Sequence, residues 1–79
     1  MTDRFDGMNL EEMLAALRAD GWSVAIHNDY VLNGLEDKTY KMTFWLFTHP
    51  YGVYVKGEAP TDREAVLTCA KAADEDFDI

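Results

Sequence analysis

The sequence predicts an α+β domain in the order α-β-β-β-α, with two helices packed on one face of a three-stranded antiparallel sheet. Apolar residues recur at helical spacing after Asn9 and again after Thr61, which indicates a helix near each end of the chain. Between these helices, residues 39–48 are rich in aromatic and β-branched side chains and contain no Gly or Pro, as expected of a central strand.

The first helix is predicted to run from about Leu10 to Asp20. Asn9 stands at the N-cap and Glu12 at the acidic position of a capping box, while Gly21 can adopt the left-handed conformation that ends a helix. Residues 1–8 show no periodicity and are predicted to form a flexible arm. The apolar stripe of the helix consists of Leu10, Met13, Leu14 and Leu17.

A first strand is predicted from the alternation of Trp22, Val24 and Ile26 with smaller or polar residues. The following segment, 28–38, allows two interpretations. The Asn33-Gly34 pair favours a long twisted hairpin, whereas the polar residues around it also suit a strand followed by a loop.

The central strand, residues 39–48, has two different faces. One face is wholly apolar and is therefore predicted to form the floor of the core. The other face mixes polar and aromatic residues and is expected to be only partly covered. The apolar face carries Tyr40, Met42, Phe44 and Leu46, and the mixed face carries Lys41, Thr43, Trp45 and Phe47.

The third strand is predicted to begin at Val53, after a type I turn that has Pro50 at its second position and Gly52 at its fourth. A simple reversal of the chain pairs Leu46 with Val55. A glycine bulge at Gly52 would shift the pairing by one residue and exchange the faces. The simple reversal is preferred because it groups apolar side chains.

The second helix is predicted to begin after Thr61, where Thr61 and Glu64 form a capping box, and to end near Asp74. Residues 9–73 are then one domain, followed by an acidic tail at 74–79. The slim stripe of this helix consists of Val66, Cys69, Ala70 and Ala73. The predicted core consists of Leu14, Leu17, Trp22, Ile26, Phe44, Leu46, Val55 and Val66.

Composition narrows the function classes. Fifteen acidic residues against seven basic ones give the 79-residue chain a net charge of −8, which disfavours direct binding to nucleic acid or to anionic membranes and favours a basic partner. The single cysteine, Cys69, and the charged N-terminal residues suggest a reducing, cytoplasmic location, with no membrane span and no disulfide within the chain.

Catalytic, metal-ligating and cofactor-binding motifs are not recognised in the sequence, so a non-enzymatic protein without cofactor or metal is expected. His27 and His49 have no ligand-spaced neighbours, and Cys69 lies on the stripe of the second helix, where it suits a small buried side chain.

Two groups of residues are predicted to contact a partner. Acids stand in the connection between the first two strands and in the tail, and aromatic residues follow the mixed sheet face, a residue type that is frequent in interface hot spots. The alternatives are that the acids form only a solvated rim, and that the aromatic residues are covered by segment 28–38 or by a helix. The predicted partner-binding residues are Asp29, Glu36, Asp37, Trp45, Phe47, Tyr54, Asp74, Glu75 and Asp76.

The layout resembles small acidic proteins of bacteriophages and prophages, a group that includes anti-CRISPR inhibitors. The resemblance lies in a Leu/Ala-rich helix ending in Gly-Trp, residues 13–22, and in a closing Thr-x-x-Glu-Ala helix start, residues 61–66. It implies a DNA mimic that, in the cytoplasm of a host bacterial cell, blocks a basic nucleic-acid-binding surface, such as that of a CRISPR effector complex. The alternatives are a self-associating accessory protein, for instance a homodimer that uses the aromatic sheet face, and a small-molecule-binding module.

Overall fold

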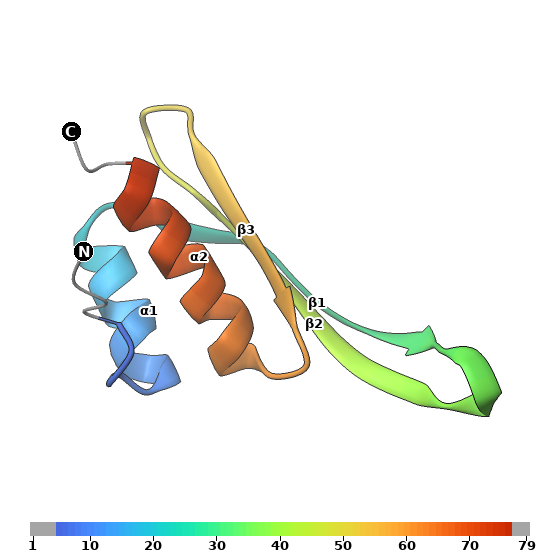
Figure 1. Cartoon of the computed structure of the whole chain (residues 1–79). Helices are drawn as coiled ribbons and strands as arrows, with labels where there is room; N and C mark the ends of the chain where they lie inside the picture. Colours follow the sequence, from blue (N-terminus) through green and yellow to red (C-terminus); the bar gives the residue numbers. More distant parts are fainter. Residues whose placement is uncertain (1–4, 77–79) are drawn as a thin grey trace.

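The computed structural model describes residues 5–76 and confirms the predicted order α-β-β-β-α. Both helices lie on the same side of a three-stranded antiparallel sheet of order β1-β2-β3 (Figure 1). The elements are α1 (Leu10–Ala19), β1 (Ser23–Asn33), a 3-10 turn η1 (Leu35–Asp37), β2 (Thr39–Thr48), β3 (Tyr54–Ala59) and α2 (Asp62–Asp76).

Helix α1 begins and ends as its sequence predicts. The Asn9 side chain accepts a hydrogen bond from the Glu12 backbone, and the Glu12 carboxylate accepts one from the Asn9 backbone, which completes the capping box. Gly21 follows the helix with φ +98°, a conformation that costs glycine little. The Met13 and Leu17 side chains are buried against α2, whereas Leu14 is only half-buried.

Strands β1 and β2 form one long hairpin, which decides between the two interpretations of residues 28–38. Pairing runs from Ser23 opposite Thr48 to Asn33 opposite Thr39, with an irregularity between Val24 and Ile26. Strand β3 pairs only with residues 43–48 of β2, so the far end of the hairpin, residues 30–42, projects as a two-stranded ribbon beyond the rest of the fold (Figure 1). We call this projection the hairpin arm.

The turn between β2 and β3 shifts the pairing by one residue, so the prediction of a simple reversal is wrong. Gly52 has φ +86° and donates a hydrogen bond to the His49 carbonyl, and His49 in turn bonds to Val53. Phe47 therefore faces Val55, and Leu46 faces Lys56. Because side chains alternate along a strand, this shift places Val55 on the same face as Phe47.

The mixed face of β2 is consequently the one covered by α2, and the prediction that the apolar face forms the core floor is wrong. Phe47 is 2% exposed and Trp45 is also buried, whereas Phe44 and Leu46 are half-buried. The predicted core is correct for Leu17, Trp22, Val55 and Val66. It is wrong for the solvent-exposed Ile26 and for the half-buried Leu14, Phe44 and Leu46.

Small residues let α2 lie directly on the sheet. Its buried stripe includes Cys69, and facing it on β3 is Gly57, where an added Cβ would come 2.3 Å from the Ala65 carbonyl oxygen. The Cys69 thiol donates a hydrogen bond to the Trp45 carbonyl, 3.4 Å away, and burial raises the pKa of this thiol to about 12. Cys69 is therefore an inert core residue, as its helical position predicts.

The flexible arm predicted for residues 1–8 is corrected for residues 5–8, since residues 1–4 lie outside the described part. Phe5 is 1% exposed and belongs to the core. Arg63 on α2 donates to the backbone carbonyls of Asp6 and Met8, and Lys71 forms an ion pair with Asp6. Helix α2 continues to Asp76, so the start of the predicted tail is helical and only residues 77–79 lie beyond the described structure.

Across residues 5–76, neither helix has the length and apolar character that crossing a membrane requires.

Candidate functional site

The sheet face that points away from the helices, which we call the open face, is mostly apolar. A solvated face of an antiparallel sheet normally carries polar residues, because only the other face is buried. Here Tyr54 is 61% exposed, and Ile26, Leu32 and Tyr40 are also exposed. The open face consists of Ile26, Asn28, Tyr30 and Leu32 from β1, Tyr40, Met42, Phe44, Leu46 and Thr48 from β2, and Tyr54, Lys56 and Glu58 from β3.

One polar contact crosses the open face. The Tyr30 hydroxyl on β1 donates a hydrogen bond to the Glu58 carboxylate on β3, and so spans the central strand. This hydrogen bond raises the pKa of Tyr30 above its ordinary value, because the phenol proton is held by a negative group. The contact leaves the apolar side chains on either side of it open to solvent.

The hairpin arm adds further exposed apolar side chains. Leu35, at its tip, is 91% exposed, and Val31 is exposed on the arm's other face. Glu36 and Asp37 beside Leu35 both adopt left-handed backbone angles, with φ 62° and φ 60°. Exposed apolar side chains on a projecting arm are typical of elements that contact another molecule.

The predicted partner-binding residues do not form one surface. Trp45 and Phe47 are core residues beneath α2, so a partner surface built on them is not available in the folded chain. Tyr54 lies on the opposite, open face, at the end of the sheet away from the arm. Glu36 and Asp37 stand at the arm's tip, roughly 30 Å along β2 from the partner residue of Tyr54.

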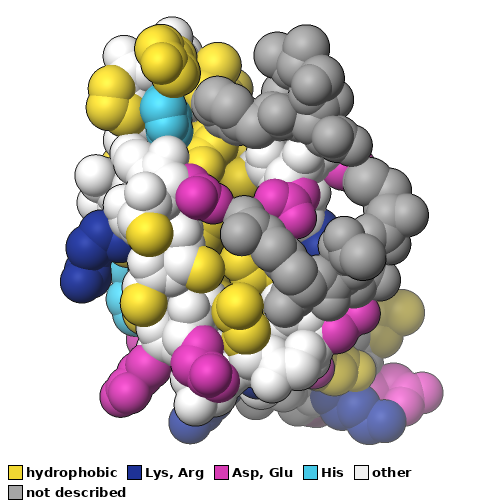
Figure 2. Space-filling model, turned by 90° about the vertical axis from the view of Figure 1, so that its left-hand side faces the viewer, with side chains coloured by type: hydrophobic (Ala, Val, Ile, Leu, Met, Phe, Trp, Pro, Cys, Tyr) yellow, Lys and Arg dark blue, Asp and Glu magenta, His cyan; other side chains and the backbone are white. Residues whose placement is uncertain are grey.

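The predicted tail acids lie neither on the open face nor on the hairpin arm. Asp74 and Glu75 belong to the last turn of α2, on the helix side of the sheet, and Asp76 is the last helical residue. On the side of the molecule seen in Figure 2, acidic side chains are dispersed among apolar and neutral ones.

Asp29, another predicted contact residue, instead belongs to a polar cluster. Nε2 of His27 lies 3.6 Å from Oδ1 of Asp29 and 3.2 Å from Oδ1 of Asp62, the first residue of α2. The same Asp62 oxygen accepts a hydrogen bond of 3.0 Å from the indole Nε1 of Trp45, on which the His27 ring is stacked at 3.9 Å between ring centres. Thr43 lies beside them on β2.

The electrostatics of the cluster favour negative charge on Asp62. The indole hydrogen bond from Trp45 lowers the pKa of Asp62 below its ordinary value, and the Thr43 hydroxyl and His27 act in the same direction. Desolvation opposes them and is outweighed. Asp62 is therefore a carboxylate across the physiological pH range.

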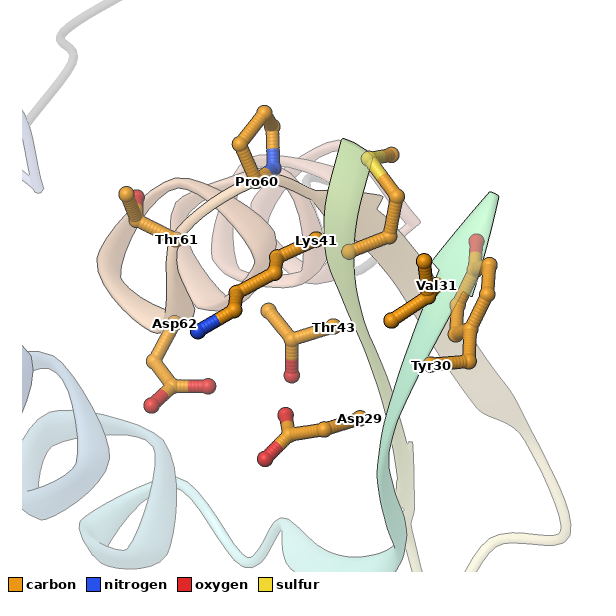
Figure 3. A pocket seen from close by; sticks show the side chains of 9 residues that line it. Asp29, Tyr30, Val31, Lys41, Thr43, Pro60, Thr61 and Asp62 are labelled. Atoms are coloured by element: carbon orange, nitrogen blue, oxygen red, sulfur yellow. The ribbon is translucent and has the colours of Figure 1, made fainter. Parts of the chain in front are cut away.

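The cluster opens onto a pocket of about 540 Å³ between the hairpin arm and the start of α2 (Figure 3). Carboxylate, ammonium and hydroxyl groups line it together with apolar side chains, as in sites that bind small ligands. Its lining consists of Asp29, Tyr30, Val31, Lys41, Met42, Thr43, Pro60, Thr61 and Asp62.

None of the residues predicted from the sequence to bind a partner, other than Asp29, belongs to this cluster, although part of its signal is visible in the sequence. His27 and Asp29 are two residues apart and share a face in the long-hairpin interpretation, in which the first strand continues past His27. Asp62 joins them only through the packing of α2 on the sheet, which no spacing motif encodes. His49, the other histidine, lies apart from the cluster and contacts the Asp20 carbonyl through Nε2 at 3.0 Å.

Comparisons with protein-family models, with curated proteins and with solved structures gave no match for this chain.

Proposed function

We propose that this protein is a non-enzymatic inhibitor that binds a basic, nucleic-acid-binding surface of another protein, with a CRISPR effector complex as the expected target class. The observation that carries the proposal is the open face, where exposed apolar side chains occupy all three strands of the sheet. Patches of this kind on a single chain are typical of protein interaction sites.

Charge complementarity supports a basic partner. The chain carries a net charge of −8, which attracts a positive surface over about a Debye length and accelerates association. Glu36 and Asp37, at the tip of the projecting arm, reach furthest from the core and would meet such a surface early. The apolar open face would then provide the desolvated contact that holds the complex together.

The test is competition with labelled DNA for purified CRISPR effector complexes, measured at low and high salt. Reversing the charge of Glu36 and Asp37 to Lys should slow association, most strongly at low salt. Tyr54→Ser should speed dissociation, since aromatic anchors dominate interface energy. Tyr51→Ser is the matched control, because Tyr51 is also exposed but lies in the turn outside the open face.

Inhibition that is unchanged in both the charge-reversed and the Tyr54 variants would contradict this assignment of the surface. An absence of inhibition for every effector complex tested would contradict the expected target class.

Self-association through the open face is the second candidate, because an uncovered apolar sheet face can be buried equally well by a second copy. Light scattering after gel filtration distinguishes the two. A homodimer should persist when salt is raised, and Tyr54→Ser should convert it to a monomer, whereas the charge-directed inhibitor should be monomeric alone at every salt concentration.

A further inference from the structure

The donor atoms of the polar cluster are spaced like the ligands of a metal ion. One ligand atom from each of His27, Asp29 and Asp62 lies within 4.8 Å of the other two. Zinc holds nitrogen and oxygen ligands at about 2.0–2.2 Å, so two ligands of a tetrahedral site stand roughly 3.3–3.6 Å apart. The distances from Nε2 of His27 to the two carboxylates, 3.2 Å and 3.6 Å, agree with this separation.

The buried hydroxyl of Thr43 is a second, independent feature of the polar cluster. Thr43 is 3% exposed, and its hydroxyl oxygen has no hydrogen-bond partner of normal geometry within the described residues. In Figure 3 this oxygen points toward the carboxylates of Asp29 and Asp62. A buried hydroxyl without a partner is costly, and a water molecule bound to a metal ion at this position would satisfy it.

We propose that His27, Asp29 and Asp62 bind a divalent transition-metal ion of the zinc class, with Thr43 bonded to a water in its open coordination position. One imidazole and two carboxylates suit zinc and its neighbours better than magnesium or calcium, which prefer oxygen ligands alone. The site is separate from the open face and goes beyond the proposed inhibitor function.

Trp45 holds two of the proposed metal ligands, His27 and Asp62, in place. Its ring stacks on His27 at an interplanar angle of 20°, and its indole N–H holds the Asp62 carboxylate. Partners of this kind orient metal ligands and commonly decide affinity. A protonated His27 between two carboxylates would explain the distances equally well, but it would leave the buried Thr43 hydroxyl without a hydrogen bond of normal geometry.

The experiment titrates Zn²⁺ into the chelator-treated full chain and follows heat and tryptophan emission, with Mg²⁺ as the comparison ion. One Zn²⁺ per chain should bind, and Trp45 should report it. At about a hundredfold excess over the half-saturating concentration, Zn²⁺ should raise the melting temperature by roughly 10–20 °C. Saturable binding of Mg²⁺ with equal affinity would overturn the assigned metal class.

Ligand variants then locate the ion. His27→Ala, Asp29→Asn and Asp62→Asn should each weaken Zn²⁺ binding at least about 10–100-fold, more than the loss of an outer partner. Asp29→Asn is the safest of these for folding, because the Asp29 side chain is 77% exposed. His49→Ala is the matched control and should leave Zn²⁺ binding unchanged.

Thr43→Val tests the hydroxyl itself. The variant should leave the metal-free melting temperature equal or higher, since it removes an unpaired buried hydroxyl, and should weaken Zn²⁺ binding roughly tenfold. The proposal is overturned if the wild-type chain shows no saturable Zn²⁺ binding, or if the three ligand variants bind Zn²⁺ as the wild type does. In either case the cluster is an ion pair between His27 and its two carboxylates.

Discussion

The two faces of β2 differ in a way that their side chains alone do not reveal. The face carrying Trp45 and Phe47 also holds the polar Thr43, yet it is buried beneath α2. The face carrying Phe44 and Leu46 is apolar from Tyr40 to Leu46, yet its side chains are exposed or only half-buried and belong to the open face. The covered face therefore depends first on the size of the facing β3 side chains and on the polar partners that α2 supplies. The hydrophobicity of the β2 side chains is secondary.

The neighbouring elements decide the choice through size and polar partners. On the covered side, β3 presents Val55, Gly57 and Ala59, which leave room for a helix to approach closely. The start of α2 supplies Asp62 as a partner for the Trp45 indole. On the open side β3 presents Tyr54, Lys56 and Glu58, which would hold a helix away.

The largest expected effect contrasts two phenylalanines of the same strand. Phe47→Ala should lower the free energy of unfolding by about 3–5 kcal/mol, because it leaves a cavity under the helices, while Phe44→Ala should cost about 1–2 kcal/mol. Urea denaturation of both variants measures the difference. Equal losses would mean that the two faces are buried to the same degree in solution.

A smaller effect is expected where α2 touches β3. Gly57→Ala places a Cβ 2.3 Å from the Ala65 carbonyl oxygen and should destabilise the fold by about 2–3 kcal/mol. Gly7→Ala is the control, since no atom lies within 4 Å of its added Cβ. Thermal denaturation compares the two, and a Gly57 variant as stable as the Gly7 variant would argue against close packing of the helix.

The covered face should also respond to pH through Asp62. Because its pKa in the fold lies below the ordinary 3.8, Asp62 stabilises the fold above that pH and loses this contribution as the pH falls through the folded value. The stability difference between wild type and Asp62→Asn should thus shrink as the pH falls below about 4, and it should be under about 1 kcal/mol for so exposed a pair. A difference that persisted at pH 2 would rule out this origin.

The smallest effect on stability is expected on the open face. Tyr54→Ser should change the free energy of unfolding by no more than about 0.5 kcal/mol, because the side chain is already exposed. Chemical denaturation of the variant at a concentration where the chain is monomeric measures this value. A loss comparable to that of Phe47→Ala would show that something covers the open face even in the isolated chain.

Local signals in the sequence specify the order and type of the two helices and three strands. Helix α1 is predicted from Asn9, Glu12 and Gly21, and its capping box is present as predicted. Capping signals of this kind act within about one helical turn, so the helix ends that they specify do not depend on tertiary packing. The order α-β-β-β-α and the burial of Cys69 follow from such signals and from helical periodicity.

The register of β2 with β3, the choice of the covered face and the polar cluster depend on how the elements pack against one another. Gly52 permits either pairing of β2 with β3, and a shift of one residue exchanges every side chain between faces. The packing of α2 then favours the face with small residues on β3, and it brings Asp62 to His27 and Asp29 across more than thirty residues of chain. No local sequence pattern predicts these contacts, because they form only once helix and sheet have packed together.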